Sequence, residues 1–141
     1  MRSVPVSELY PISPITGDSV YSIRVKGTQP IMLFTSGKSK HTHLTHSVYE
    51  FFTTKYEISS DVEVYHTDLS DDNAFGFTEV NGEEQFIQIH NDLNEKDYIT
   101  TLMHELVHVV QNENGQYDDE ERENEAYSLE SILFNQFTAA N

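Results

Sequence analysis

The spacing of hydrophobic residues changes along the chain, and each change marks an expected element. Hydrophobic and polar residues alternate in residues 20–25 and 62–66, which is typical of strands, and residues 31–34 form a short apolar run. A segment with Gly and Pro separates the first strand from this run, so the two are expected to form a hairpin. Residues 35–43 are rich in Ser, Lys, Thr and His, and we expect a loop there.

The clearest hairpin signal lies between residues 75 and 90. Two runs suited to strands, 75–80 and 85–90, flank Asn81-Gly82. Asn-Gly is the favoured dipeptide of two-residue hairpin turns. We therefore expect the chain to reverse its direction at this dipeptide.

Helical spacing, with apolar residues three and four apart, appears in three segments. The first covers residues 44–56. The second begins after Asn94, a residue suited to capping a helix N-terminus, and is expected to end near Asn114, just before Gly115. The third follows an acidic linker and reaches about Phe137.

The order of these elements predicts the fold class. A hairpin, a helix, three short strands and two helices indicate an α+β protein with a small mixed or antiparallel sheet. The 141 residues fit a single domain. Within it we expect an N-terminal arm and hairpin over residues 1–40 and a core over residues 41–141.

The charge of the chain narrows the choice of partners. The formal net charge is -16, and it is concentrated in residues 61–141, which hold twenty Asp and Glu against two Lys and Arg. A surface this acidic repels phosphate, so we expect no nucleic-acid partner and favour a basic protein or peptide. Solubility is an alternative reason for the same charge.

Other features of the composition restrict the location and the chemistry. The chain has no cysteine, which excludes disulfides and thiolate metal sites. No apolar run reaches the roughly 20 residues of a membrane span, and the N-terminus lacks the apolar core of a signal peptide. We expect a soluble protein, cytoplasmic by default, with no membrane partner. The sequence does not indicate an oligomeric state.

The second predicted helix carries the pattern His-Glu-x-x-His. Apolar residues cover most of its circumference, so it is expected to be buried. Burying histidines and a glutamate is costly unless they are paired or bind a metal ion. Two histidines four residues apart lie on one face and can bind one zinc ion, with the glutamate placed as a general base. The single polar stripe of the helix consists of Thr101, His104, His108 and Gln111, with Glu105 at its edge.

A catalytic zinc site has three protein ligands and one position open to water, so a third ligand must come from elsewhere. Metzincins carry Gly and His three and six residues after the second histidine, where this chain has Gln111 and Asn114. Peptide deformylases use a cysteine, which the chain lacks. The helix is followed instead by a glutamate-rich segment, residues 121–128.

The pattern at His104 and His108, together with Glu-x-Glu-Ala-Tyr at residues 123–127, resembles the gluzincin class of zinc metallopeptidases. It is most similar to the short stand-alone members, of the minigluzincin and ImmA/IrrE-like kind, over residues 98–130. The resemblance implies a zincin-like fold with a backing helix, an active-site helix and a C-terminal glutamate helix. It also implies Zn²⁺ as cofactor and an edge strand that pairs with extended substrate, for which residues 86–90 are the candidate.

The third zinc ligand is a choice between neighbouring glutamates. The resemblance favours Glu123, because many small gluzincins place the ligand three residues before a small residue, here Ala126. Helical spacing also places Glu123 within the apolar face of the last helix, where a carboxylate needs a cation. A second family pattern, Asn-Glu-Ala, selects Glu125, and Glu121 is the remaining choice.

Further residues are candidates for supporting roles. Tyr127 stands where the resemblance implies an acidic or amide residue that supports a ligand histidine, so either its hydroxyl or Glu130 is expected to do so. Tyr127 is also a candidate donor to the oxyanion. The other candidates for that donor are Tyr117, His66 and His90.

The expected function is hydrolysis of peptide bonds in protein or peptide substrates by a zinc-activated water, with Glu105 as general base. The alternative is a non-catalytic module in which the metal ion is structural and the acidic surface binds a basic protein partner. Glu105 favours the enzyme, because a structural metal site has no use for a general base.

Overall fold

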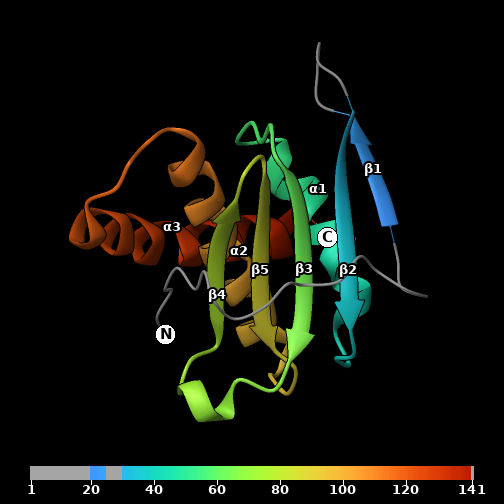
Figure 1. Ribbon diagram of the computed structural model, residues 1–141. Helices are drawn as coiled ribbons and strands as arrows, with labels where there is room; N and C mark the ends of the chain where they lie inside the picture. Colours follow the sequence, from blue (N-terminus) through green and yellow to red (C-terminus); the bar gives the residue numbers. More distant parts are fainter. Residues whose placement is uncertain (1–19, 25–29, 141) are drawn as a thin grey trace.

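The computed structural model describes residues 20–24 and 30–140, with side chains from Leu33 onward. The arm predicted for residues 1–19 lies outside the described residues. The described part is a five-stranded sheet with three α-helices on one of its sides (Figure 1). The predicted α+β class with a small mixed sheet is confirmed, whereas the single domain over residues 1–141 stays a prediction.

The sheet has the strand order β1-β2-β3-β5-β4. The outer pairs β1–β2 and β4–β5 are antiparallel, and the inner pairs β2–β3 and β3–β5 are parallel. The sheet is therefore mixed, and the described strands at its two edges are β1 and β4. The strands are β1 Val20–Arg24, β2 Pro30–Gly37, β3 Asp61–Thr67, β4 Gly76–Asn81 and β5 Glu84–His90.

The prediction that residues 86–90 form the edge that captures substrate is wrong. Strand β5 contains these residues and lies between β3 and β4, with backbone partners on both sides. Its hairpin partner β4 is the edge strand instead. Both strands of this hairpin carry buried residues, so their pattern alone did not show which one would pair with β3.

Two local predictions differ from the structure by a few residues. Asn81 pairs with Glu84, so the two-residue turn consists of Gly82 and Glu83, one residue later than predicted. Gly82 takes the positive φ of 66° that this turn requires. Strand β2 extends to Gly37, into the predicted loop, because its polar last residues pair with β3.

The three helices agree with the predicted segments. Helix α1 covers Thr45–Thr53, helix α2 Glu95–Glu113 and helix α3 Asp119–Ala140. Asn94 caps α2 as predicted, since its side chain accepts a hydrogen bond of 2.8 Å from the backbone N–H of Asp97. Gly115 follows the helix with a φ of 72°. Among the described residues, no helix has the length and apolar content to cross a membrane.

Helix α2 lies at the centre of the fold, behind β4 and β5 in Figure 1, and it also contacts α1 and α3. It is therefore buried nearly all round, as its apolar circumference predicted. Its polar stripe faces β4 and α3, which are the elements that complete the site. The hydrophobic core is formed by β2, β3, β5 and the three helices, and it includes Leu33, Val48, Phe52, Val64, Ile87, Ile89, Leu102, Leu106, Leu133 and Phe137.

Candidate metal centre

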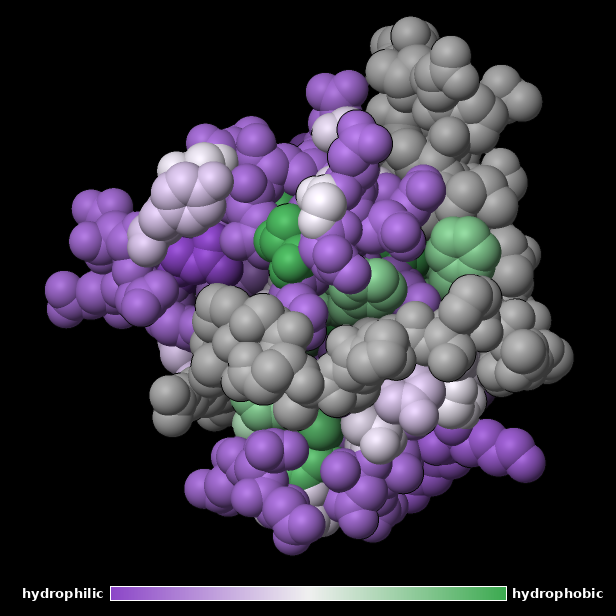
Figure 2. Space-filling model, viewed as in Figure 1, coloured by the Kyte–Doolittle hydropathy of each residue, from purple (hydrophilic) through white to green (hydrophobic). Residues whose placement is uncertain are grey.

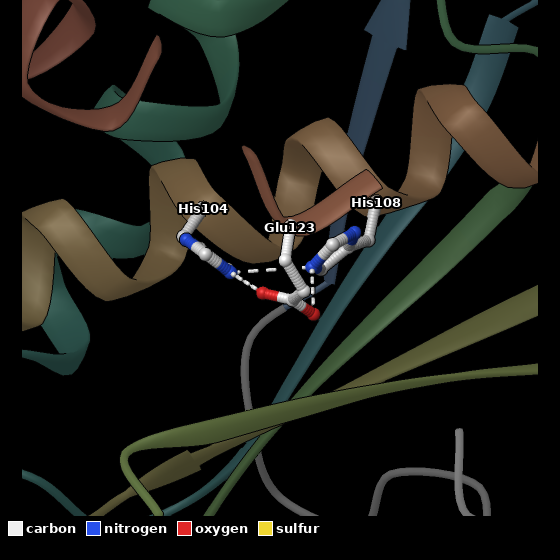
Figure 3. Close-up of side chains that lie close together, drawn as sticks. All are labelled: His104, His108 and Glu123. Atoms are coloured by element: carbon white, nitrogen blue, oxygen red, sulfur yellow. Dashed lines mark hydrogen bonds and ion pairs between the residues drawn. The ribbon is translucent and has the colours of Figure 1, made fainter. Parts of the chain in front are cut away.

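His104 and His108 of α2 and Glu123 of α3 point toward one another (Figure 3). The two Nε2 atoms are 3.2 Å apart. One carboxylate oxygen of Glu123 lies 3.1 Å from Nε2 of His104, and the other lies 3.2 Å from Nε2 of His108. Among the described residues, this is the one group of His, Asp and Glu side chains arranged to hold a metal ion.

Hydrogen bonds on the far side of each ring fix where the histidines carry their protons. Nδ1 of His104 lies 2.7 Å from a carboxylate oxygen of Glu130, and Nδ1 of His108 lies 2.7 Å from the amide oxygen of Gln111. Both partners are acceptors, so each Nδ1 is the donor. In the neutral rings each Nε2 then presents a lone pair to the centre of the site.

The orientation of the Gln111 amide is itself fixed. Its nitrogen donates to the backbone carbonyl of Arg122 at 3.1 Å and to the carboxylate of Glu125 at 2.8 Å. Because both of these groups are acceptors, the amide oxygen must face His108. Gln111 therefore joins the two helices of the site and orients one histidine at the same time.

The residues fit a zinc ion. Two nitrogen lone pairs and a carboxylate within 3.1–3.2 Å of one another repel unless a cation lies between them. Zinc binds His and carboxylate ligands at about 2.0–2.2 Å, and tetrahedral geometry then separates the ligand atoms by roughly 3.3 Å. The distance between the two Nε2 atoms, and the distance from each to its nearer Glu123 oxygen, are close to this value.

The electrostatics of the two histidines also suit a cation. Burial lowers the pKa of His108 to about 4, so this ring is neutral and able to bind a metal ion at neutral pH. Burial also lowers the pKa of His104, but Glu130 and two further carboxylates outweigh burial and raise that pKa above its usual value. The site therefore concentrates negative charge around a buried ring.

Glu105 is fully buried on α2, next to His104. The hydroxyl of Thr78 on β4 donates to a carboxylate oxygen of Glu105 at 2.5 Å. This contact is possible because β4 approaches α2 closely at Gly76, where an added Cβ would lie 2.9 Å from the side chain of Thr101. The edge strand thus fixes the orientation of the predicted general base.

The other glutamates considered as third ligand lie elsewhere. The carboxylate of Glu125 accepts hydrogen bonds from Gln111 at 2.8 Å and from Gln116 at 3.3 Å, so it supports the amide that orients His108. Glu121 is exposed and is not part of the group. The geometry favours Glu123, and the identity of the ligand stays a prediction.

The predicted supporting residues divide into two sets. Either Glu130 or Tyr127 was expected to support a ligand histidine, and Glu130 makes this hydrogen bond, to His104. The Tyr127 ring packs edge-on against His104, with 4.7 Å between centroids. His66 bonds to the hydroxyl of Tyr98, and His90 accepts from the backbone of Leu69, so the structure does not bring these two histidines to the site.

Comparison with known proteins identifies the family of the chain. A sequence profile for the IrrE N-terminal-like domain, a family of zincin-like metallopeptidases in the M78 group, matches residues 59–140. The chain belongs to this family. No match was found among curated proteins or among solved structures.

The matched region of this IrrE N-terminal-like protein contains β3, β4, β5, α2 and α3, and so all the residues of the candidate metal centre. Membership of the family points to a metallopeptidase type of function and to a zincin-like fold. The narrower resemblance to stand-alone minigluzincins is not confirmed by this match and stays a prediction.

Proposed function

We propose that this IrrE N-terminal-like protein is a zinc-dependent peptidase that hydrolyses peptide bonds in protein or peptide substrates. The observation that supports this most directly is the set of three electron-rich groups, two buried histidines and a half-buried carboxylate, that lie 3.1–3.2 Å apart. In this proposal His104, His108 and Glu123 hold the ion. Glu130 and Gln111 orient the two rings.

A zinc ion in this position supplies a Lewis acid for the peptide carbonyl and lowers the pKa of water toward ~7. Glu105 accepts the proton of the attacking water and delivers it to the leaving amine. The hydrogen bond from Thr78 holds the Glu105 carboxylate in place for both transfers. Tyr127 is the proposed oxyanion donor, because its ring lies against His104.

Substrate binding is proposed at β4, the edge strand beside the site. An extended peptide can add to a sheet edge through main-chain hydrogen bonds, while alternate side chains enter pockets on either face. Gly76, Thr78 and Val80 lie on the α2 side of this strand. A Cβ added at Gly76 would meet Thr101, Thr78 bonds to Glu105, and Val80 lines the same pocket as Asn112. A peptide on β4 would therefore run beside the strand residue that bonds to Glu105.

The test combines metal content with hydrolysis. Purified protein should contain one zinc ion per chain and should cleave members of a random peptide library. Glu105→Gln should retain the zinc and lose hydrolysis, whereas Glu95→Gln, an exposed change in the first turn of the same helix, should preserve both. A zinc-loaded protein that cleaves no peptide, but binds basic peptides, would favour the non-catalytic module instead.

A further inference from the structure

A pocket of about 330 Å³ adjoins the metal centre, between the end of β4 and the loop that leads into α3. Its walls include Thr78 and Val80 of β4, Asn112 of α2, Tyr117 of the loop and Arg122 of α3. Thr78 bonds to the predicted general base, and Arg122 precedes the proposed zinc ligand Glu123. A group in this pocket would therefore lie beside the strand residue that bonds to the predicted general base.

Three polar residues of this pocket, Thr78, Asn112 and Arg122, already make hydrogen bonds within the protein. The Thr78 hydroxyl donates to Glu105 at 2.5 Å. Arg122 donates through Nη1 to the side-chain oxygen of Asn112 at 2.7 Å and to the backbone carbonyl of Gln116 at 2.9 Å. The amide nitrogen of Asn112 donates to Gln85 at 2.9 Å. These three side chains thus offer an occupant little hydrogen bonding to replace the water that it would displace.

What the pocket does offer is apolar surface. Val80 is 49% exposed and Tyr117 is 76% exposed, which makes them two of the five exposed large hydrophobic residues in the described part of the chain. Figure 2 shows that the surface over α3 and the loop before it is otherwise mostly hydrophilic. Covering these two side chains would stabilise a complex by removing apolar area from water.

The charges at the pocket disfavour acidic occupants. The acidic residues Glu79 and Asp119 are among those that line the pocket, whereas Arg122 is buried and its Nη1 is held by two acceptors. An acidic side chain would meet like charge here. A bulky uncharged side chain would meet the Val80 side chain and the Tyr117 ring without burying an unpaired polar group.

We propose that this pocket is a specificity subsite that takes a bulky apolar side chain of the substrate, such as Phe, Leu or Met, and that Val80 and Tyr117 determine this preference. The inference rests on the proposed peptidase function. The geometry of strands supports this subsite. Successive side chains of a strand point to opposite faces, so every second side chain of a peptide paired with β4 lies on the same face as Thr78 and Val80. One of these side chains lies beside Thr78, and the next one on that face reaches the pocket.

The experiment measures kcat/KM for zinc-loaded protein on peptides of one length in which each position carries Phe, Leu, Ser or Asp in turn. At one position the kcat/KM of the wild type should be about tenfold or more higher for Phe or Leu than for Ser. Tyr117→Ser and Val80→Ser should each reduce this ratio of kcat/KM values at least threefold, and the double variant should abolish the preference. Ile132→Ser, an exposed apolar change on α3 outside the pocket, should leave the ratio unchanged.

Binding of the same peptides to zinc-loaded Glu105→Gln, with and without Tyr117→Ser, separates this inference from the proposed function. If the wild type cleaves peptides but the ratio is the same in the Val80 and Tyr117 variants, the subsite is wrong and the peptidase stands. If nothing is cleaved, the peptidase is wrong. In that case the binding data alone would decide the subsite. Tighter binding of Phe peptides than of Ser peptides, lost in the Tyr117→Ser variant, would support it. Equal binding of Phe and Ser peptides would overturn it. Zinc content and melting temperature should be the same in all variants.

Discussion

The carboxylate of Glu130 lies 2.7 Å from Nδ1 of His104, on the side of the ring that faces away from the metal centre. The two residues belong to different helices, so this hydrogen bond also fixes α3 relative to α2. A histidine held in this way presents an unprotonated Nε2 and becomes a better ligand. The equivalent support for His108 comes from Gln111, three residues along the same helix, at 2.7 Å.

We predict that Glu130→Ala weakens zinc binding by about ten- to a hundredfold, because the ring of His104 loses the acceptor that fixes its tautomer and its orientation. Competition with a chromogenic chelator gives the affinity. Glu130→Gln should lose less, since the amide oxygen can still accept the hydrogen bond. Glu121→Ala, which removes an exposed glutamate of the same helix, serves as the control. Equal affinities in all four proteins would contradict this role for Glu130.

Alanine substitutions at Glu123 and Glu125 should have different effects on metal content. Glu123→Ala removes the carboxylate that lies 3.1 Å and 3.2 Å from the two histidines, so the purified protein should contain no zinc. Glu125→Ala should keep its zinc with reduced affinity, because Gln111 loses one of its two acceptors. Elemental analysis of both proteins checks this. Full zinc content in Glu123→Ala would show that another group is the third ligand.

Thr78→Val should reduce kcat by about tenfold with little change in KM or zinc content. The substitution preserves shape but removes the donor that holds the carboxylate of Glu105, and a hydrogen bond to a charged group contributes roughly 1.5–3 kcal/mol. Steady-state kinetics on a cleaved peptide measure the effect. Thr138→Val, an exposed change near the end of α3, is the matched control. A rise in KM alone would mean that Thr78 binds substrate and does not position the base.

The parts of this fold that sequence predicted correctly are those set by local rules. The Asn94 cap, the end of α2 before Gly115 and the polar stripe of α2 depend on residues within a few positions of one another. The pairing of β5 with β3 joins residues 23 positions apart, and the strand pattern does not encode it. The edge strand was therefore assigned to the wrong arm of the hairpin.

The same distinction between local and long-range information applies to the candidate metal centre. The motif at His104 and His108 and the need for a glutamate follow from the sequence, but the choice between Glu123 and Glu125 depends on how α3 crosses α2. Gln111 stood on the predicted polar stripe, yet its link to Arg122 and Glu125 joins two helices and could not be predicted from one. The signal that could have indicated it is its spacing of three from His108.

Gly37→Ala should destabilise the protein by about 2 kcal/mol or more. Gly37 has a φ of 75°, and a Cβ there would lie 2.0 Å from the backbone oxygen of His66, so β2 and β3 would have to separate. Urea denaturation gives the free energy of unfolding. Gly82→Ala is the matched control, because Gly82 also has a positive φ, of 66°, but no atom lies within 4 Å of its Cβ position. That variant should lose only about 1 kcal/mol, the cost of the left-handed conformation. Equal losses would exclude the close contact as the cause.

Glu63 should make stability fall as pH rises. Burial raises the pKa of this β3 side chain to about 7, the hydrogen bond from Ser36 acts in the opposite direction, and the charge of Glu84 adds to the rise. An unfolded glutamate has a pKa near 4.5, so between pH 4.5 and pH 7 the folded protein binds more protons at this position. Its contribution is therefore present at pH 4.5 and lost by pH 8, a change of roughly 1 to 3 kcal/mol. Glu63→Gln cannot ionise at this position. Urea denaturation at pH 5 and pH 8 should therefore show that its free energy of unfolding, relative to that of the wild type, is higher at pH 8 by that amount. The exposed change Glu57→Gln should show no such pH-dependent difference. If the difference in free energy of unfolding between Glu63→Gln and the wild type is the same at both pH values, Glu63 titrates normally in the folded protein.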